Sequence, residues 1–191
     1  MDRIIGAFTF RKGVYTEVEH DASFTTTAYI IVAIVAILNQ LGANALGGFD
    51  NLLGWAGGTV VGTVFALVAF AVGVAVVSWV GQTIYKAEVT FDELVRTLGL
   101  AYVWQVIGVI GVLSAVSLTL TCIVAPIQLV AALAGLAAWF VAAKEALDLE
   151  WIQTIITVVA AWVVVLIITF VASVIIGLLG FGAAAAGGLL G

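Results

Sequence analysis

The chain has 191 residues, of which 64% are hydrophobic and 9% are charged, and its formal net charge at pH 7 is -5. Soluble domains carry about 25% charged residues, so this composition excludes an ordinary soluble fold and predicts that most of the chain lies in lipid. Six Lys and Arg residues stand against eleven Asp and Glu residues. Because no basic surface for phosphates can be assembled from them, we expect no nucleic-acid partner.

The chain before the first apolar run differs from the rest. It carries Arg3, Arg11 and Lys12 and no small-residue cleavage site, so we expect no removable signal peptide. The apolar residues of its first part share one helical face, which predicts a short interfacial helix within residues 1–24. Those apolar residues are Met1, Ile4, Ile5 and Phe8, followed by a second group at Val14, Tyr15 and Val18. This segment is either part of a cytoplasmic docking surface or an anchor for the first pass.

Charged residues divide the remainder into four uncharged runs. The runs cover residues 22–49, 51–85, 97–143 and 151–191. A membrane pass needs about 20 residues, so the third run holds two passes, with a hairpin within 114–126 and Pro126 in the first turn of the next helix. The predicted passes are 25–41, 53–79, 91–118, 123–147 and 151–179.

The predicted fold class is therefore an all-α integral membrane helical bundle with five transmembrane helices. We expect one domain over residues 1–191, in which residues 25–179 form the bundle and residues 180–191 form a Gly/Ala-rich tail. All six basic residues fall on one side of these passes, which the positive-inside rule assigns to the cytoplasm. The N-terminus is then cytoplasmic and the expected location is the cell inner (cytoplasmic) membrane.

Aromatic residues near the ends of the predicted passes are typical of an interfacial belt. These residues are Trp55, Trp79, Tyr85, Trp139 and Trp151. Trp104 and Trp162 lie deeper and are interpreted as packing residues.

The connection between the second and third passes has a readable helix start. Thr90 and Glu93 have the spacing of a capping box, and Asp92 and Arg96 are four residues apart and can pair on one helical face. Solvated loops and helix ends account for these charges, and docking of a cytoplasmic partner is the alternative. The docking candidates are Arg11, Lys12, Lys86, Asp92, Glu93 and Arg96.

A stripe of small residues runs along the second pass at helical spacing. It consists of Gly58, Gly62, Ala66, Ala69 and Gly73. Helices in lipid associate by close backbone approach over such residues, so the stripe is interpreted as a packing face. It packs either against this chain's own helices or against a partner.

Side chains that could perform chemistry are scarce. One Cys (Cys122) and one His (His20) provide no disulfide and no metal cage of the usual spacings, and no Ser-His-Asp set is visible. We therefore expect no catalytic residue, no metal and no cofactor. His20, between Glu19 and Asp21, is interpreted as a hydrated imidazole, with a pigment or haem ligand as the weaker alternative.

The passes contain amides but no charged residue in their interiors, which disfavours ion-coupled transport. Hydration or interhelical hydrogen bonds account for these amides, most of which lie near predicted helix ends. They are Asn39, Gln40, Asn44, Gln82, Gln105 and Gln128.

Three stretches, at residues 2–11, 90–101 and 143–149, resemble the prokaryotic branch of the Yip-one (Ypt/Rab-interacting protein) domain family. The resemblance implies a five-pass membrane scaffold without catalytic residues that associates with other membrane proteins. Eukaryotic members bind small GTPases, a role that the prokaryotic branch is not expected to share. The family often has a proline shortly after the Gly-x-Ala of the third pass, whereas here Tyr102-Val103-Trp104 follows Ala101. The resemblance therefore does not extend to a proline kink in this helix.

The sequence favours an accessory or assembly subunit of a larger membrane complex, with a respiratory or photosynthetic assembly as a natural host. Its expected partners are the lipid bilayer and other integral membrane proteins, bound chiefly through helix faces because the loops are short. The alternative is a passive carrier or channel for a lipid or a small apolar solute. That function would need a continuous polar line along a helix, and the sequence has none.

Overall fold

A computed structural model describes residues 2–47, 49 and 51–179, which form helices joined by short connections and contain no strand. The elements in chain order are α1 (Asp2–Phe8), α2 (Val14–Glu19), α3 (Phe24–Ala43), the 3₁₀ helix η1 (Asn44–Gly47), α4 (Leu52–Ile84), α5 (Phe91–Ala101), the 3₁₀ helix η2 (Tyr102–Ala115), α6 (Leu118–Leu147) and α7 (Trp151–Leu178). Five segments are long and apolar enough to cross a membrane, since α5 and η2 count as one. The predicted all-α bundle is confirmed, and the tail expected at 180–191 lies outside the described residues.

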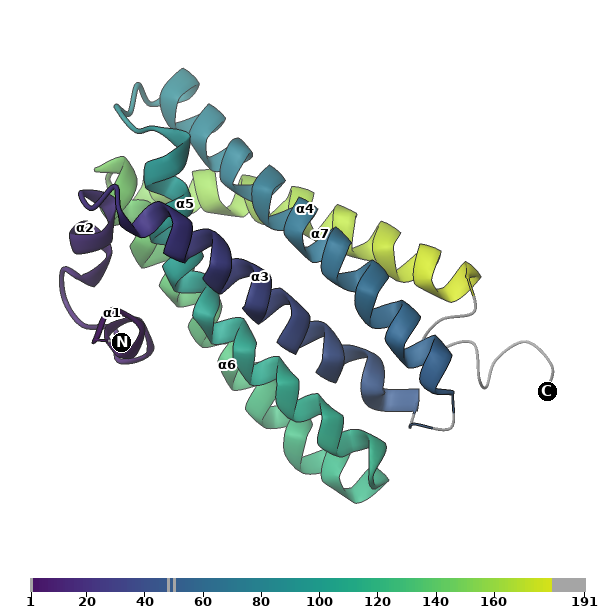
Figure 1. The fold of residues 1–191 in the computed structure, drawn as a ribbon. Coiled ribbons are helices and arrows are strands. Elements are labelled where there is room, and N and C mark those ends of the chain that lie inside the picture. Colours follow the sequence, from purple (N-terminus) through teal and green to yellow (C-terminus); the bar gives the residue numbers. More distant parts are fainter. Residues whose placement is uncertain (1, 48, 50, 180–191) are drawn as a thin grey trace.

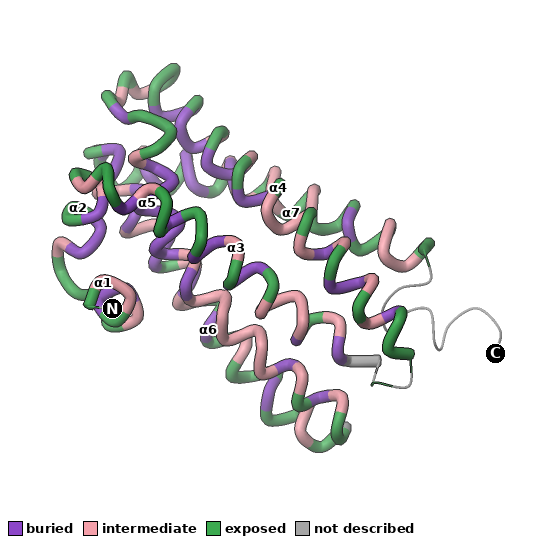
Figure 2. The backbone as a smooth tube through the Cα atoms, viewed as in Figure 1, coloured by how far each residue is buried: buried purple, intermediate pink, exposed green. Residues whose placement is uncertain are grey.

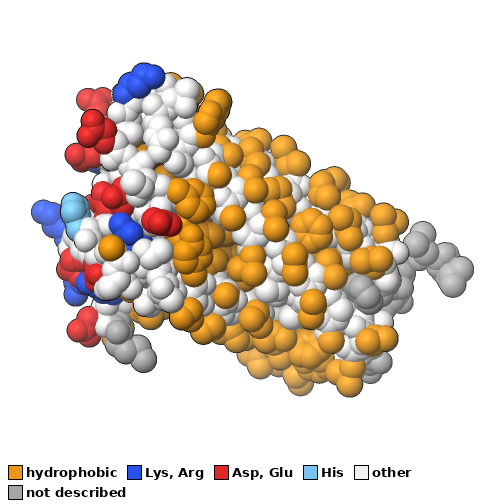
Figure 3. All heavy atoms as spheres, turned by 45° about the horizontal axis from the view of Figure 1, so that its top comes forward, with side chains coloured by type: hydrophobic (Ala, Val, Ile, Leu, Met, Phe, Trp, Pro, Cys, Tyr) orange, Lys and Arg blue, Asp and Glu red, His pale blue; other side chains and the backbone are white. Residues whose placement is uncertain are grey.

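The long segments lie side by side in the order α7, α4, α3, η2 and α6 (Figure 1). Every charged residue that the structure describes belongs to residues 2–21, 86–96 or 144–150, which gather at one end of the bundle (Figure 3). We call this the charged end and the opposite end the far end. The surface between them is dominated by hydrophobic side chains, as expected for a protein surrounded by lipid.

The third pass changes helix type in its middle. It begins as α5 and continues from Tyr102 as η2, a 14-residue 3₁₀ helix. In a 3₁₀ helix, residues three apart lie on one face, so Gln105, Gly108, Gly111 and Ser114 form a line of small and polar residues. At this face the backbones of η2 and α3 approach closely, because a Cβ atom on Gly111 would lie 2.6 Å from the Gly42 carbonyl oxygen. The sequence did not predict this change, which starts directly after Gly99-Leu100-Ala101.

The fourth pass starts earlier than predicted. Helix α6 begins at Leu118, where the Ser117 side chain accepts a hydrogen bond from the Thr119 backbone N–H. Pro126 therefore lies inside the helix, and its predicted place in the first turn is wrong. The physical reason is the Ser117 cap, which satisfies a free N–H group and starts the helix two turns before the proline.

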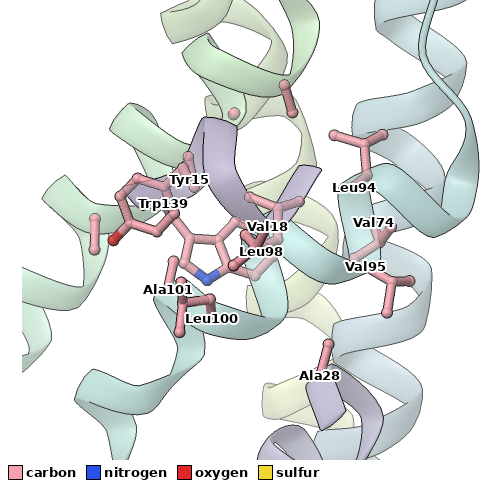
Figure 4. Close-up of a cluster of buried hydrophobic side chains, with 14 of the residues drawn as sticks. Tyr15, Val18, Ala28, Val74, Leu94, Val95, Leu98, Leu100, Ala101 and Trp139 are labelled. Carbon is pink, nitrogen blue, oxygen red and sulfur yellow. The ribbon is translucent and has the colours of Figure 1, made fainter. Parts of the chain in front are cut away.

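The most densely packed part of the molecule lies toward the charged end, where buried residues are concentrated (Figure 2). Leu94, Leu98 and Trp139 meet there with Tyr15 and Val74 (Figure 4). The Trp139 ring lies edge-on to Phe70, at 6.1 Å between ring centroids. The prediction that Trp139 belongs to an interfacial belt was wrong. Trp139 lies two turns before the end of α6, at a position that faces the core.

The N-terminal helices pack against the bundle. Val14, Tyr15 and Val18 of α2 are buried in the same core, and the Trp104 indole N–H donates to the Ala7 carbonyl oxygen at 3.3 Å. The expectation that this segment presents its apolar face to the membrane surface is wrong for α2, because α5 and α6 cover that face. In α1, Ile5 remains exposed.

Candidate functional site

A cleft of about 830 Å³ opens at the charged end between α2 and the connections α4–α5 and α6–α7. We call it the charged-end cleft. Its charged lining residues are Glu19, Lys86, Glu88, Lys144, Glu145 and Asp148. Thr16, His20 and Trp151 also line it. Four carboxylates against two ammonium groups make the cleft acidic.

Local backbone geometry fixes the two connections that form the walls of the cleft. Lys86 and Asp148 both adopt left-handed backbone angles, with φ of 59° and 52°; Lys86 lies two residues after the end of α4, and Asp148 directly follows α6. The Gln82 side chain donates to the Val89 carbonyl oxygen at 2.6 Å and so ties the first connection to α4. The Gln153 side chain accepts from the Glu150 backbone N–H at the start of α7.

Two side-chain contacts join the walls of the cleft. The Thr16 hydroxyl of α2 donates to the Glu145 carboxylate of α6, so it holds the N-terminal segment against α6. The Lys144 ammonium of α6 lies 5.5 Å from the centre of the Trp151 ring at the start of α7, a cation–π distance.

The electrostatics of the cleft favour a positively charged ligand. The pKa of Glu19 is raised above its ordinary value, first by burial, while the neighbouring Glu93, Asp148 and Glu145 carboxylates also raise it. His20 acts in the opposite direction. Beside the cleft, burial raises the pKa of Tyr15, whose hydroxyl has no hydrogen-bond partner among the described residues. A cation brought next to Glu19 would relieve this crowding of negative charge.

The predicted capping box at the α4–α5 connection is confirmed. The Thr90 backbone N–H donates to the Glu93 carboxylate at 2.6 Å, and the Glu93 N–H donates to the Thr90 hydroxyl at 3.3 Å. Glu93 is therefore engaged in starting α5, and its role as a docking residue stays a prediction.

Arg96 does not fit a docking role, because it is only 7% exposed. Its guanidinium donates to the Glu19 carbonyl oxygen from two nitrogens, at 2.5 and 3.0 Å, and to the Thr25 hydroxyl at 3.0 Å. The acidic group nearest to it is Glu93, at 4.0 Å, and the expected pair with Asp92 does not form. The prediction erred because only the tertiary fold brings the end of α2 onto α5.

The other docking candidates lie on the surface of the charged end. Lys86 lines the charged-end cleft, Arg11 pairs with Glu17 at 2.7 Å, and Lys12 and Asp92 are exposed. The structure thus brings Lys86 together with residues of α2 and of the α6–α7 connection. No sequence signal indicated that residues of the α6–α7 connection belong to the same site as Lys86.

The small-residue stripe of α4 faces the chain's own helices. A Cβ atom on Gly58 would lie 2.6 Å from the Asn44 side chain, and one on Gly62 would collide with the Gln40 side chain. Toward the charged end, a Cβ on Gly73 would lie 3.0 Å from Val165 of α7. The stripe therefore accommodates α3, η1 and α7, which was one of its two interpretations.

Within the described part of the chain, no group of three or more His, Cys, Asp or Glu side chains could hold a metal ion. Comparison of the chain with models of protein families, with characterised proteins and with solved structures finds no match.

Proposed function

We propose that the chain is a non-enzymatic multi-pass membrane scaffold, an accessory subunit that holds a partner at the charged end of the bundle. The observation that carries this proposal is the charged-end cleft. Its 830 Å³ fall within the range of binding pockets, and its walls come from three segments that are far apart in the sequence. Lipid tails do not fill a cleft lined by charged groups, because burying those groups in hydrocarbon is costly.

The charges that line the cleft indicate which side chains the partner carries. Glu19, Glu88, Glu145 and Asp148 outnumber Lys86 and Lys144, and the pKa of Glu19 is raised first by burial and then by neighbouring carboxylates. A polypeptide segment with basic side chains would pair with these groups. The proposed partner is therefore a membrane protein with a basic segment next to the bilayer.

Helix α7 offers a second contact surface within the membrane. It packs mainly along α4, so much of its circumference is not covered by other residues that the structure describes. Ile152, Leu166 and Phe170 are exposed by 58–72%. Such a face suits the intramembrane partners that the short loops led us to expect.

The resemblance to the Yip-one family supports the same proposal, since it implies a scaffold without catalytic residues. The positive-inside rule supports a cytoplasmic charged end in a bacterial inner membrane. A respiratory or photosynthetic complex remains the proposed host. Passive transport is less well supported, because the buried side chains of Leu94, Leu98 and Trp139 fill the bundle toward the charged end.

Co-purification from native membranes in a mild detergent tests the scaffold role. The wild-type chain is compared with Glu88→Lys, which reverses a charge in the cleft, and with Asp2→Lys, the same charge change outside it. We expect one partner to accompany the wild-type chain and Asp2→Lys and to be depleted with Glu88→Lys. If all three proteins elute alone, or if deleting the chain alters solute or lipid transport and leaves every membrane complex intact, the proposal fails.

A further inference from the structure

A second cavity, of about 250 Å³, lies among the transmembrane segments α3, η2 and α6. We call it the amide pocket. Its polar lining consists of the carboxamides of Asn39, Gln105 and Gln128, and Trp104, Gly108 and Ala132 contribute to its walls. Among the described residues, no charged side chain lines it.

The amide pocket lies deep in the membrane. Ten residues of η2 follow Gln105, which at a rise of about 2.0 Å per residue places it about 20 Å from the far end of the third pass. A similar length of α5 and η2 separates Gln105 from the charged end, so Gln105 is near mid-span. Asn39 lies four residues before the end of α3 and Gln128 ten residues after the start of α6, so the pocket extends from there toward the far end. In a hydrocarbon core about 30 Å thick, little water is available at this depth to form hydrogen bonds with polar groups.

The hydrogen bonds of the three amides leave part of their capacity unused. The Asn39 Nδ2 group donates to the Gln105 carbonyl oxygen at 2.8 Å, and the Gln128 Nε2 group donates to the Gly108 carbonyl oxygen at 3.1 Å. These bonds orient the Asn39 and Gln128 side chains through their amide nitrogens. Among the described residues, Asn39 Oδ1 and Gln128 Oε1 have no donor and Gln105 Nε2 has no acceptor. Unpaired amide atoms in an apolar medium cost free energy, which a ligand with matching groups would recover.

We propose that the amide pocket binds the head of a neutral amphiphile that carries hydroxyl donors and an oxygen acceptor. The two free amide oxygens would accept from hydroxyls, and the Gln105 amide would donate to an oxygen of the same head. An anionic head is disfavoured because no cationic side chain would compensate its charge. The pocket is smaller than the 300 Å³ at which sites for whole drug-sized ligands begin, so it takes a head while the apolar tail lies in the surrounding lipid.

Two classes of membrane molecule share this chemistry, namely diacylglycerols and reduced isoprenoid quinones. The experiment uses the full chain in detergent and two probes, dioctanoylglycerol and decylubiquinol, with dioctanoyl phosphatidylglycerol as the anionic comparison. Native mass spectrometry counts bound molecules, and the midpoint of thermal unfolding reports binding through ligand-dependent stabilisation. A probe that binds identifies the source, and either one supports the proposal.

Matched variants locate the binding. Ala132→Leu adds volume at an exposed position that lines the pocket, whereas Ala137→Leu makes the same change at an exposed position of α6 outside it. We expect one equivalent of a neutral probe on the wild-type chain and on Ala137→Leu, and at least tenfold weaker binding on Ala132→Leu. Gln128→Leu provides a second test if Ala132→Leu does not fold. The proposal is overturned if neither neutral probe binds better than phosphatidylglycerol, or if a folded pocket variant binds as well as Ala137→Leu. The result is independent of the scaffold role.

Discussion

Arg96 is the residue that joins the N-terminal segment to the bundle. Its buried guanidinium holds the Glu19 carbonyl oxygen with two donors, and replacing it with Met would leave that oxygen and the Thr25 hydroxyl without a partner. Hydrogen bonds to charged groups contribute about 1.5–3 kcal/mol, so we expect Arg96→Met to lower the free energy of unfolding by about that amount. Unfolding by denaturant in detergent, together with proteolysis of the first 23 residues, measures the effect.

Two further variants make the Arg96 experiment specific. Arg96→Lys should restore little stability, because one ammonium group cannot reproduce the planar, two-nitrogen contact. Lys86→Met removes a basic residue that is exposed at the same end and should change stability by less than about 0.5 kcal/mol. Equal stability of Arg96→Met and Lys86→Met would contradict the anchoring role.

We expect the attachment of α1 to depend on pH through the ion pair of Asp21 with Arg3. The Ser23 hydroxyl, at 2.5 Å, and the Arg3 guanidinium, at 2.6 Å, donate to the Asp21 carboxylate and lower its pKa from the ordinary value of 3.8. A lowered folded-state pKa stabilises the protein above the ordinary value, and this contribution is lost as the pH falls through the lowered pKa. In a background that keeps Trp104 as its one tryptophan, fluorescence of this residue, which contacts Phe8, should therefore report release of α1 on acidification.

The control for this pH effect is Asp21→Asn, which keeps the size of the side chain and removes the titration. Its Trp104 signal should lack the acid transition that the wild-type chain shows. An identical transition in both proteins would mean that another group controls the attachment.

At the scale of single elements, charge and apolar patterning located the five passes, and the Thr90 and Glu93 spacing located the start of α5. These features depend on neighbouring residues in the chain, so the sequence alone was sufficient to predict them. The start of α6, the 3₁₀ geometry of η2 and the burial of Trp139 were missed. The start of α6 depends on the local Ser117 cap, whereas the other two depend on contacts between helices: in η2, for example, Gly108 and Gly111 approach α3 closely. A helical period of 3.6 residues gives no hint of that contact.

The candidate site was predicted less completely than the fold. Lys86 was identified, because charged residues between passes are visible in the sequence. Glu19, Glu145 and Asp148 were not connected with it, because only the tertiary fold brings α2 and the α6–α7 connection to the same cleft. The amides of Asn39, Gln105 and Gln128 are visible in the sequence, but their convergence on one pocket within the bundle depends on the tertiary fold.

The stripe on α4 gives a prediction for this element. A side chain at Gly62 would collide with Gln40 of α3, so Gly62→Leu should force the two helices apart and destabilise the bundle by about 1–3 kcal/mol. Val60→Leu adds volume to the exposed face of the same helix and is the control. Thermal unfolding followed by circular dichroism compares the two. A Gly62→Leu protein as stable as Val60→Leu would mean that α3 does not pack closely against this stripe.

At the scale of the whole molecule, the concentration of charge at one end predicts a single orientation in the membrane. Asn51 lies at the far end and Glu88 at the charged end. In a Cys122→Ser background, membrane-impermeant maleimide should label Asn51→Cys from outside the cell and Glu88→Cys only after the membrane is opened. Labelling of both from the same side would contradict the five-pass topology, and the reversed pattern would contradict a cytoplasmic charged end.

If the charged-end cleft holds a partner protein, as proposed, photo-cross-linking in native membranes should capture that partner. A benzophenone amino acid is placed at position 88 inside the cleft or at position 12, which is exposed at the same end but does not line the cleft. We predict a discrete adduct with one other membrane protein from position 88, and its loss or marked reduction from position 12. Adducts with lipid alone from position 88, or the same protein adducts in the same yield from both positions, would contradict the claim.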